Sequence, residues 1–153
     1  MPGYKTHLVG GVVSFGLVVF IAGFLSASFS TLFEWLCCAC LGALFPDIDI
    51  KSKGQQLFFR VTAVVFVVLL WQRRITDVAI MSTIALIPLT VKHRGITHSM
   101  WFIGALCAMI FTIVACTAAS YLTMVFFDLL FFFAGAFSHV LLDFGPRKLF
   151  FRK

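Results

Sequence analysis

Charged side chains are scarce in this sequence of 153 residues: 12% are Asp, Glu, Lys or Arg, whereas 61% are hydrophobic. A soluble domain carries about 25% charged and roughly 45–50% apolar residues, so the composition excludes an ordinary water-soluble protein and also a disordered chain. We therefore expect an integral membrane protein whose main partner is the lipid bilayer. The length allows about six spans with short connections, so residues 1–153 are expected to form one membrane domain.

Motifs that define several common protein classes are also missing. A Walker A sequence, a dinucleotide-binding glycine pattern and a Gly-x-Ser-x-Gly elbow are all absent, which leaves P-loop nucleotide hydrolysis and serine esterase chemistry without support. The five cysteines lie inside apolar segments without the spacing of a disulfide framework, and we interpret them as reduced packing residues. The net charge of +6 comes from basic residues that flank apolar runs, so no nucleic-acid partner is expected.

Long apolar runs are abundant, and they predict an all-α, multi-pass transmembrane bundle of about six helices. Leu8–Phe29 is too long for the core of a signal peptide and suits a span. Met100–Leu142 as one helix would be about 65 Å long, roughly twice the hydrocarbon thickness, so it should fold back near Ala118–Tyr121. The remaining segments are shorter, and the sequence leaves open whether they cross fully: Leu32–Phe45, Leu57–Trp71 and Ile75–Val91.

The basic residues are distributed unevenly between the two sides of this six-span arrangement. Arg73 and Arg74 fall on one side, and the other ten of the twelve fall on the opposite side: nine in the two termini and the loops at 47–56 and 92–99, and Arg60 at the start of Leu57–Trp71. By the positive-inside rule, that side faces the cytoplasm. We therefore predict a membrane protein with both termini cytoplasmic.

All four histidines and three of the six acidic residues fall at this predicted cytoplasmic end. His139 and Asp143 are four residues apart on one helical face, as a shared pair of metal ligands requires. Asp143 also lies at a helix C-terminus, where the helix dipole disfavours an anion and a cation should compensate it. That cation is either a bound metal or the side chain of Arg147 or Lys148.

Three further segments carry candidate ligands, each with a simpler alternative. His7 begins a helix, where the dipole favours the neutral, metal-binding imidazole, but it also fits an interfacial histidine. Asp47 and Asp49 follow the second apolar run and are either ligands or part of a solvated loop. The stretch 92–99 contains His93 and His98: either a turn at Gly95 brings them together or they bind different metal ions, and the simpler alternative is a basic loop that binds lipid headgroups.

The sequences PDID at 46–49, HRGITHS at 93–99 and SHVLLD at 138–143, together with His7, resemble the YdjM-like family of bacterial membrane-bound, predicted metal-dependent hydrolases, associated in part with LexA regulation. The resemblance runs in order over nearly the whole chain. It implies an inner-membrane protein and, by more distant similarity to zinc-dependent phospholipase C-like proteins, a phosphoesterase-type site with one or two metal ions. The implied ligand set is His7, Asp47, Asp49, His93, His98, His139 and Asp143.

Three functions are compatible with these residues. The first is a hydrolase of a phospholipid-like phosphoester at the cytoplasmic headgroup layer, with zinc favoured over manganese, iron or magnesium. Arg94 and Lys92 would stabilise phosphoryl charge as catalytic residues, and Thr97, Ser99 and Ser138 would orient the ligating imidazoles. The second is a metal-binding sensor, regulator or transport component without catalysis, and the third is a protein that binds anionic lipid through its basic loops.

Overall fold

The computed structural model of the protein describes residues 3–49, 53–71, 73 and 97–145. This part of the chain folds into helices and contains no strand. The predicted segment Ile75–Val91 and the basic stretch 92–96 lie outside the described residues. The described elements, in chain order, are α1 (Tyr4–Ile21), η1 (Phe24–Ser26), α2 (Phe29–Leu44), η2 (Phe45–Asp49), α3 (Lys53–Trp71), α5 (Met100–Thr117), η3 (Ala119–Tyr121) and α6 (Leu122–Phe144).

The predicted boundary between the first two helices is wrong, because the chain turns before Phe29 and not at Ser30-Thr31. Helix α1 ends at Ile21, and Gly23 then takes a positive φ of 70°, a conformation that glycine adopts without steric cost. Ser28 starts α2, because its side chain accepts a hydrogen bond from the backbone N–H of Thr31 at 3.3 Å. The start of the second helix is therefore determined by the N-cap at Ser28 and not by the polar pair Ser30-Thr31 between the two apolar runs.

The predicted fold-back of the long C-terminal apolar run is confirmed. Helix α5 ends at Thr117, a short 3-10 turn follows, and α6 begins at Leu122. Four described helical segments are long and apolar enough to cross a membrane: Tyr4–Ile21, Phe29–Ile48, Met100–Thr117 and Ala119–Phe144. The protein is thus an all-α membrane bundle, while the total of six spans stays a prediction.

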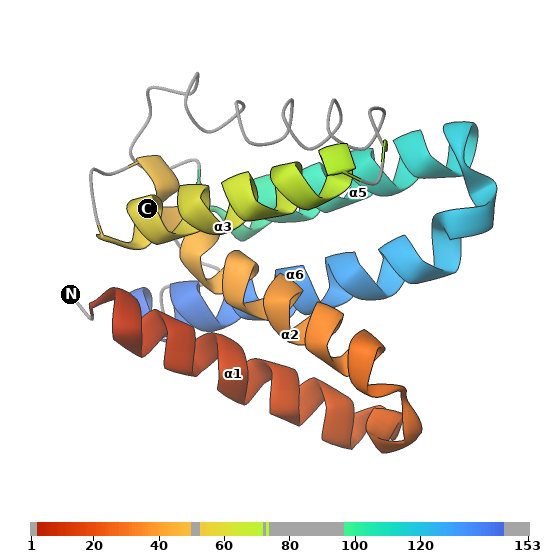
Figure 1. The fold of residues 1–153 in the computed structure, drawn as a ribbon. Coiled ribbons are helices and arrows are strands. Elements are labelled where there is room, and N and C mark those ends of the chain that lie inside the picture. Colours follow the sequence, from red (N-terminus) through yellow and green to blue (C-terminus); the bar gives the residue numbers. More distant parts are fainter. Residues whose placement is uncertain (1–2, 50–52, 72, 74–96, 146–153) are drawn as a thin grey trace.

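Helices α2 and α6 occupy the middle of the bundle (Figure 1). Helix α1 lies on one side of this pair, and α3 and α5 lie on the other. The start of α1, the end of α2, the start of α5 and the end of α6 all lie at one end of the bundle, as the alternation of spans requires. Every predicted site residue that the structure describes comes from this end.

Helices α2 and α6 cross in unusually close contact because glycines face backbone at the crossing. A Cβ atom added to Gly42 would lie 1.9 Å from the carbonyl oxygen of Phe132, and one added to Gly135 would lie 1.9 Å from that of Ala39. Helix α1 joins the contact, since a Cβ on Gly11 would lie 3.0 Å from the Cβ of Ala43. Small residues of this kind allow membrane helices to pack backbone against backbone.

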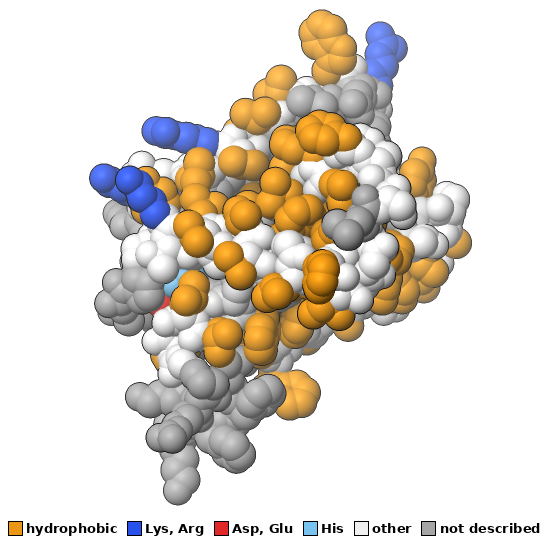
Figure 2. Space-filling view, turned by 90° about the horizontal axis from the view of Figure 1, so that it is seen from below, with side chains coloured by type: hydrophobic (Ala, Val, Ile, Leu, Met, Phe, Trp, Pro, Cys, Tyr) orange, Lys and Arg blue, Asp and Glu red, His pale blue; other side chains and the backbone are white. Residues whose placement is uncertain are grey.

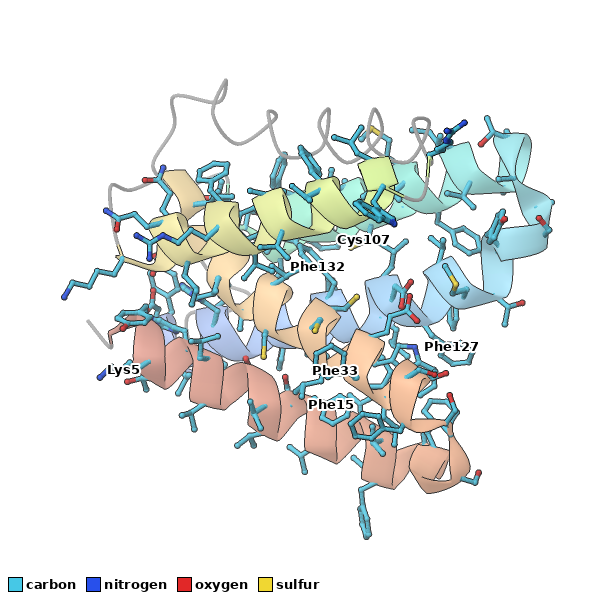
Figure 3. The ribbon with its side chains drawn as sticks, viewed as in Figure 1. Lys5, Phe15, Phe33, Cys107, Phe127 and Phe132 are labelled. Atoms are coloured by element: carbon cyan, nitrogen blue, oxygen red, sulfur yellow. The ribbon has the colours of Figure 1, made fainter. Side chains whose placement is uncertain are left out.

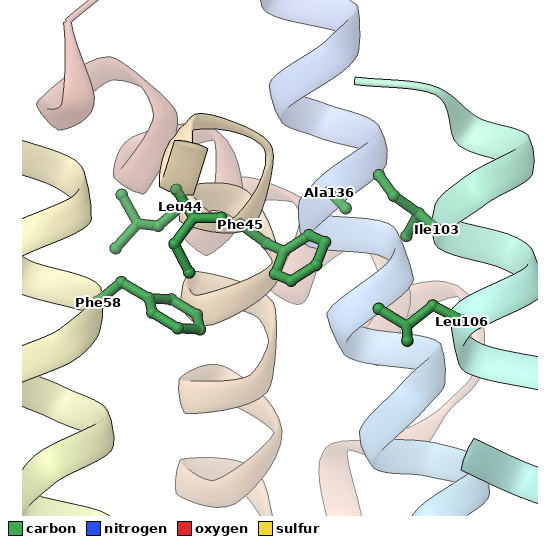
Figure 4. Packing of buried hydrophobic residues seen from close by; sticks show 7 residues of the cluster. Leu44, Phe45, Phe58, Ile103, Leu106 and Ala136 are labelled. Carbon is green, nitrogen blue, oxygen red and sulfur yellow. The ribbon is translucent and has the colours of Figure 1, made fainter. Parts of the chain in front are cut away.

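Two apolar clusters flank this crossing. At the site end, Phe45 of η2 packs with Phe58 of α3 and Ile103 of α5 (Figure 4). Towards the other end, Trp35 of α2 stacks on Phe131 of α6 with ring centroids 4.9 Å apart, and Phe15 and Phe127 belong to the same aromatic group (Figure 3). The two clusters hold α1, α2, α5 and α6 in register above and below the glycines.

The crossing predicts that Gly135→Ala destabilises the protein. The new methyl group would overlap the backbone of α2, so the helices must separate, and we expect a cost at or above the upper end of the roughly 1–3 kcal/mol typical of overpacking. The measurement is the thermal unfolding midpoint of the detergent-purified protein. Gly16→Ala is the matched control, because nothing lies within 4 Å of its added Cβ, and an equal midpoint in both variants would contradict the packing argument.

Candidate metal centre

Five of the predicted ligands converge at one end of the bundle, although they come from four separate parts of the chain. His7 belongs to the first turn of α1, Asp47 to η2, and His98 directly precedes α5. His139 and Asp143 lie one turn apart near the end of α6. Close packing of α1 and α2 on α6 brings the first two groups to the last, and the turn before α5 brings His98.

His139 is the most constrained member of the cluster. Its ring is fully buried, and its Nδ1 donates a hydrogen bond to the carbonyl oxygen of Ala43 at 2.6 Å. Ala43 lies in the last turn of α2, where the helical hydrogen-bond ladder runs out and carbonyls accept other donors. Because Nδ1 carries the proton, the lone pair of the neutral ring is on Nε2, which faces Asp143 Oδ2 at 3.4 Å and Asp47 Oδ1 at 3.6 Å.

His98 approaches the same two carboxylates from the start of α5. Its Nε2 lies 3.5 Å from Asp47 Oδ1 and 3.6 Å from Asp143 Oδ2. The hydroxyl of Thr97, which is fully buried, lies 3.4 Å from His98 Nδ1. The rings of His98 and His139 meet edge to face at 5.4 Å, and both Nε2 atoms face the same two oxygens, Asp47 Oδ1 and Asp143 Oδ2.

His7 lies on the other side of Asp143. Its Nε2 is 3.4 Å from Asp143 Oδ1, and its ring stacks on that of His139 with centroids 3.7 Å apart. Only 1% of His7 is exposed, and its place in the first turn of α1 disfavours the charged imidazolium. The two oxygens of Asp143 therefore face different histidines.

The nitrogen–oxygen distances within the cluster match the separation of two ligand atoms bound to one metal ion better than the length of a direct hydrogen bond. N–H···O hydrogen bonds are usually 2.7–3.2 Å long, whereas the five histidine–carboxylate distances are 3.4–3.6 Å. Ligand atoms about 2.0–2.2 Å from a tetrahedral ion are themselves about 3.3–3.6 Å apart. Four residues offer ligand atoms that all lie within 4.8 Å of one another: Asp47, His98, His139 and Asp143.

The charge of the cluster also calls for a cation. The side chain of Asp143 is 7% exposed and that of Asp47 is 23% exposed, so two carboxylates lie close together with little access to water. Burial of such charges costs several kcal/mol each unless they are paired. Among the described residues, His139 Nε2 and Asp143 Oδ1 are buried without a hydrogen-bond partner, and a divalent ion would satisfy both nitrogen and oxygen donors.

The other predicted site residues fall into two groups. Ser138 is turned away from the imidazoles, because its hydroxyl donates to the carbonyl of Gly135 at 2.7 Å, and Ser99 is the N-cap residue of α5 without a side-chain cap bond. Asp49 ends η2, and its side chain is outside the described part of the structure. The following candidates also lie outside the described residues: Lys92, His93, Arg94, Arg147 and Lys148.

One contributor to the centre was not anticipated from the sequence. The carbonyl of Ala43 orients His139, and a backbone group of this kind leaves no signature of its own in a sequence. The indirect signal is the small-residue spacing of Ala39, Gly42 and Ala43 on α2 and Gly135 and Ala136 on α6, which indicates close helix packing.

Comparisons with known proteins identify the family of the chain. Neither the curated proteins nor the solved structures compared with the chain include a match. The family model described as YdjM inner membrane protein matches residues 1–147, which includes every residue of the cluster. With four apolar helical segments of spanning length and a match over almost its entire length, the chain belongs to the YdjM inner membrane protein family.

Proposed function

We propose that this protein is a membrane-embedded metallohydrolase that hydrolyses a phosphoester bond in a phospholipid-like substrate. The observation that carries the proposal is the convergence of two histidines and two carboxylates from η2, the start of α5 and α6 on one point, at distances that suit metal coordination. The mixed nitrogen and oxygen donors favour zinc, with manganese and iron as alternatives. The absence of cysteine from the cluster argues against a purely structural zinc site.

A second ion could be held on the far side of Asp143. Its Oδ1 faces His7 while its Oδ2 faces His98 and His139, so this carboxylate is placed to serve two neighbouring sites. Asp49 and His93 keep their predicted roles as further ligands, which rest on the sequence alone. The proposal therefore covers one or two ions, with His7 and Asp143 as the residues on which the second depends.

Each residue of the centre has a defined task in such a reaction. A divalent ion, when bound, supplies Lewis acidity that makes water more acidic and withdraws charge from a phosphoryl oxygen. His139, held by the Ala43 carbonyl, and His98, beside the Thr97 hydroxyl, present Nε2 in a fixed direction. Asp47 is the more exposed carboxylate, so substrate and water would enter on its side. Arg94 and Lys92 would stabilise charge on the phosphoryl group.

The location of the centre suggests the substrate class. It lies at one end of the helices, which in a bilayer would be in the headgroup layer, and the first turn of α1 carries the exposed Lys5 at the same end (Figure 3). A phospholipid places its phosphoester at this depth while its acyl chains stay in the hydrocarbon region. A hydrolase here would reach the phosphate without extracting the lipid.

The first prediction from this proposal concerns metal content. Purified protein reconstituted with zinc should retain one to two equivalents of zinc by mass spectrometry. Asp47→Asn or His139→Ala should lose at least one equivalent, because each change removes one of the four ligand atoms that converge on one point. Glu34→Gln is the control, since Glu34 is exposed at the opposite end of α2 and should leave the content unchanged. Full metal content in both site variants, with their fold intact, would disprove this centre.

The second prediction concerns turnover. Zinc-loaded protein should release a phosphorylated headgroup or phosphate from phospholipid in mixed micelles. Arg94→Ala should keep its metal but react about 10²–10³-fold more slowly, as expected when one donor to developing charge is removed. Arg73→Ala is the control, because Arg73 lies at the far end of α3. Normal metal content without hydrolysis of any phospholipid, with zinc, manganese, iron and magnesium each tried, would favour a metal-binding sensor instead.

The third prediction concerns sidedness. We propose that the centre faces the cytoplasm, because ten of the twelve basic residues are predicted on that side. Alkaline phosphatase, which is active only outside the cytoplasm, should be inactive when fused after Lys153 and active when fused after Arg74. The reverse pattern would place the centre on the periplasmic side.

A further inference from the structure

A groove runs along the outer surface of the bundle between α1 and α6. It has a volume of about 470 Å³ and an almost entirely apolar lining. Two serines line it without making it polar, because Ser14 donates to the carbonyl of Gly11 and Ser138 to that of Gly135 within their own helices. The main lining side chains are Val9, Val13 and Leu17 of α1 and Phe137, Leu141 and Leu142 of α6.

One end of this groove lies at the same end of the bundle as the candidate metal centre, in the first turn of α1 and the last turn of α6. Thr6 and Leu142 line the groove, and the residues that follow them in the chain are His7 and Asp143. On α6, Ser138 also lines the groove and is followed in the chain by His139. Figure 2, which looks onto the α1 side of the bundle, shows a face dominated by hydrophobic side chains with a small area of His and Asp colour near its left edge, the side on which Figure 1 places the N-terminus. The groove is therefore an apolar surface that begins at the end of the bundle where the candidate ligands lie, although none of their side chains lines it.

The length of the groove matches one leaflet of a bilayer. Along α1 it extends from Thr6 to Val18, twelve residues that rise about 18 Å in a helix. Half of a hydrocarbon core of roughly 30 Å is about 15 Å. The 18 residues of α1 rise about 27 Å in total, so the groove covers most of this helix, and its length and apolar lining suit a single acyl chain.

We propose that this groove seats an acyl chain of the phospholipid substrate, with the phosphoester of that lipid at the metal centre. The inference rests on the proposed function for the identity of the lipid as substrate, but the groove itself makes a separate claim about binding. Val9, Val13 and Leu17 lie one helical turn apart along α1, from near the centre to deep in the leaflet. A longer acyl chain would reach Leu17, whereas a short one would contact only the side chains nearer the centre.

The binding test uses a photoactivatable phosphatidylglycerol with a diazirine at the end of its acyl chain, in vesicles of phosphatidylethanolamine and phosphatidylglycerol. Crosslinks should concentrate on α1 and α6 residues that line the groove. Val13→Trp should reduce them at least fivefold by filling the groove, and Val12→Trp is the matched control, because Val12 is its chain neighbour, is similarly exposed and does not line the groove. Crosslinks spread evenly over all helices, or lost equally in both variants, would overturn the proposal.

The kinetic test separates the groove from the catalytic centre. Leu17→Trp, at the deep end, should slow hydrolysis of lipids with 16-carbon chains at least tenfold while sparing 8-carbon chains, and Val9→Trp, near the centre, should slow both. Metal content should stay unchanged in every variant, which also reports that they fold. Equal effects of Leu17→Trp on both chain lengths would overturn the inference. If no phospholipid is hydrolysed, the proposed function fails and the crosslinking result alone decides whether a lipid occupies the groove.

Discussion

The close crossing of α2 and α6 is the constraint on which the rest of the centre depends. Gly42 and Gly135 each present a hydrogen atom where any other residue would place a carbon against backbone of the opposite helix. Only at this separation can His139 of α6 reach the carbonyl of Ala43 on α2, at 2.6 Å. A wider crossing would leave the imidazole free to rotate and its nitrogens without a defined direction. The close packing of α2 on α6 therefore also determines the orientation of His139.

A cluster of two carboxylates and three histidines with little access to water is costly unless a cation compensates the charge of Asp47 and Asp143. A soluble protein could relieve such a cluster with water, but here the ends of α1 and α6 exclude most of it, and Asp143 is 7% exposed. Two apolar clusters, around Phe45 and around Trp35, pack the helices on either side of the α2–α6 crossing. A structure that tolerates this cost at one end while packing so closely elsewhere is typical of a functional site.

Much of this centre could be predicted from the sequence, for reasons particular to membrane proteins. Hydropathy determines which segments span, and alternation of spans then assigns each polar residue to one end of the bundle. His7, His98 and His139 could be placed together in this way without any knowledge of tertiary contacts. The i, i+4 spacing of His139 and Asp143 further predicted one shared helical face. Boundaries were less predictable, since the turn before Phe29 depends on Gly23 and on the cap at Ser28 and not on polarity.

The sequence by itself determined the class of protein, the main apolar runs and the group of residues at one end, because these follow from the cost of placing charge and bare backbone in lipid. Only the tertiary structure decided which ligands meet and how. The stacking of His7 on His139, the division of the two Asp143 oxygens between different histidines and the role of the Ala43 carbonyl all depend on how helices rotate and approach. Those variables are set by packing between segments far apart in the chain, which a residue pattern along one segment does not encode.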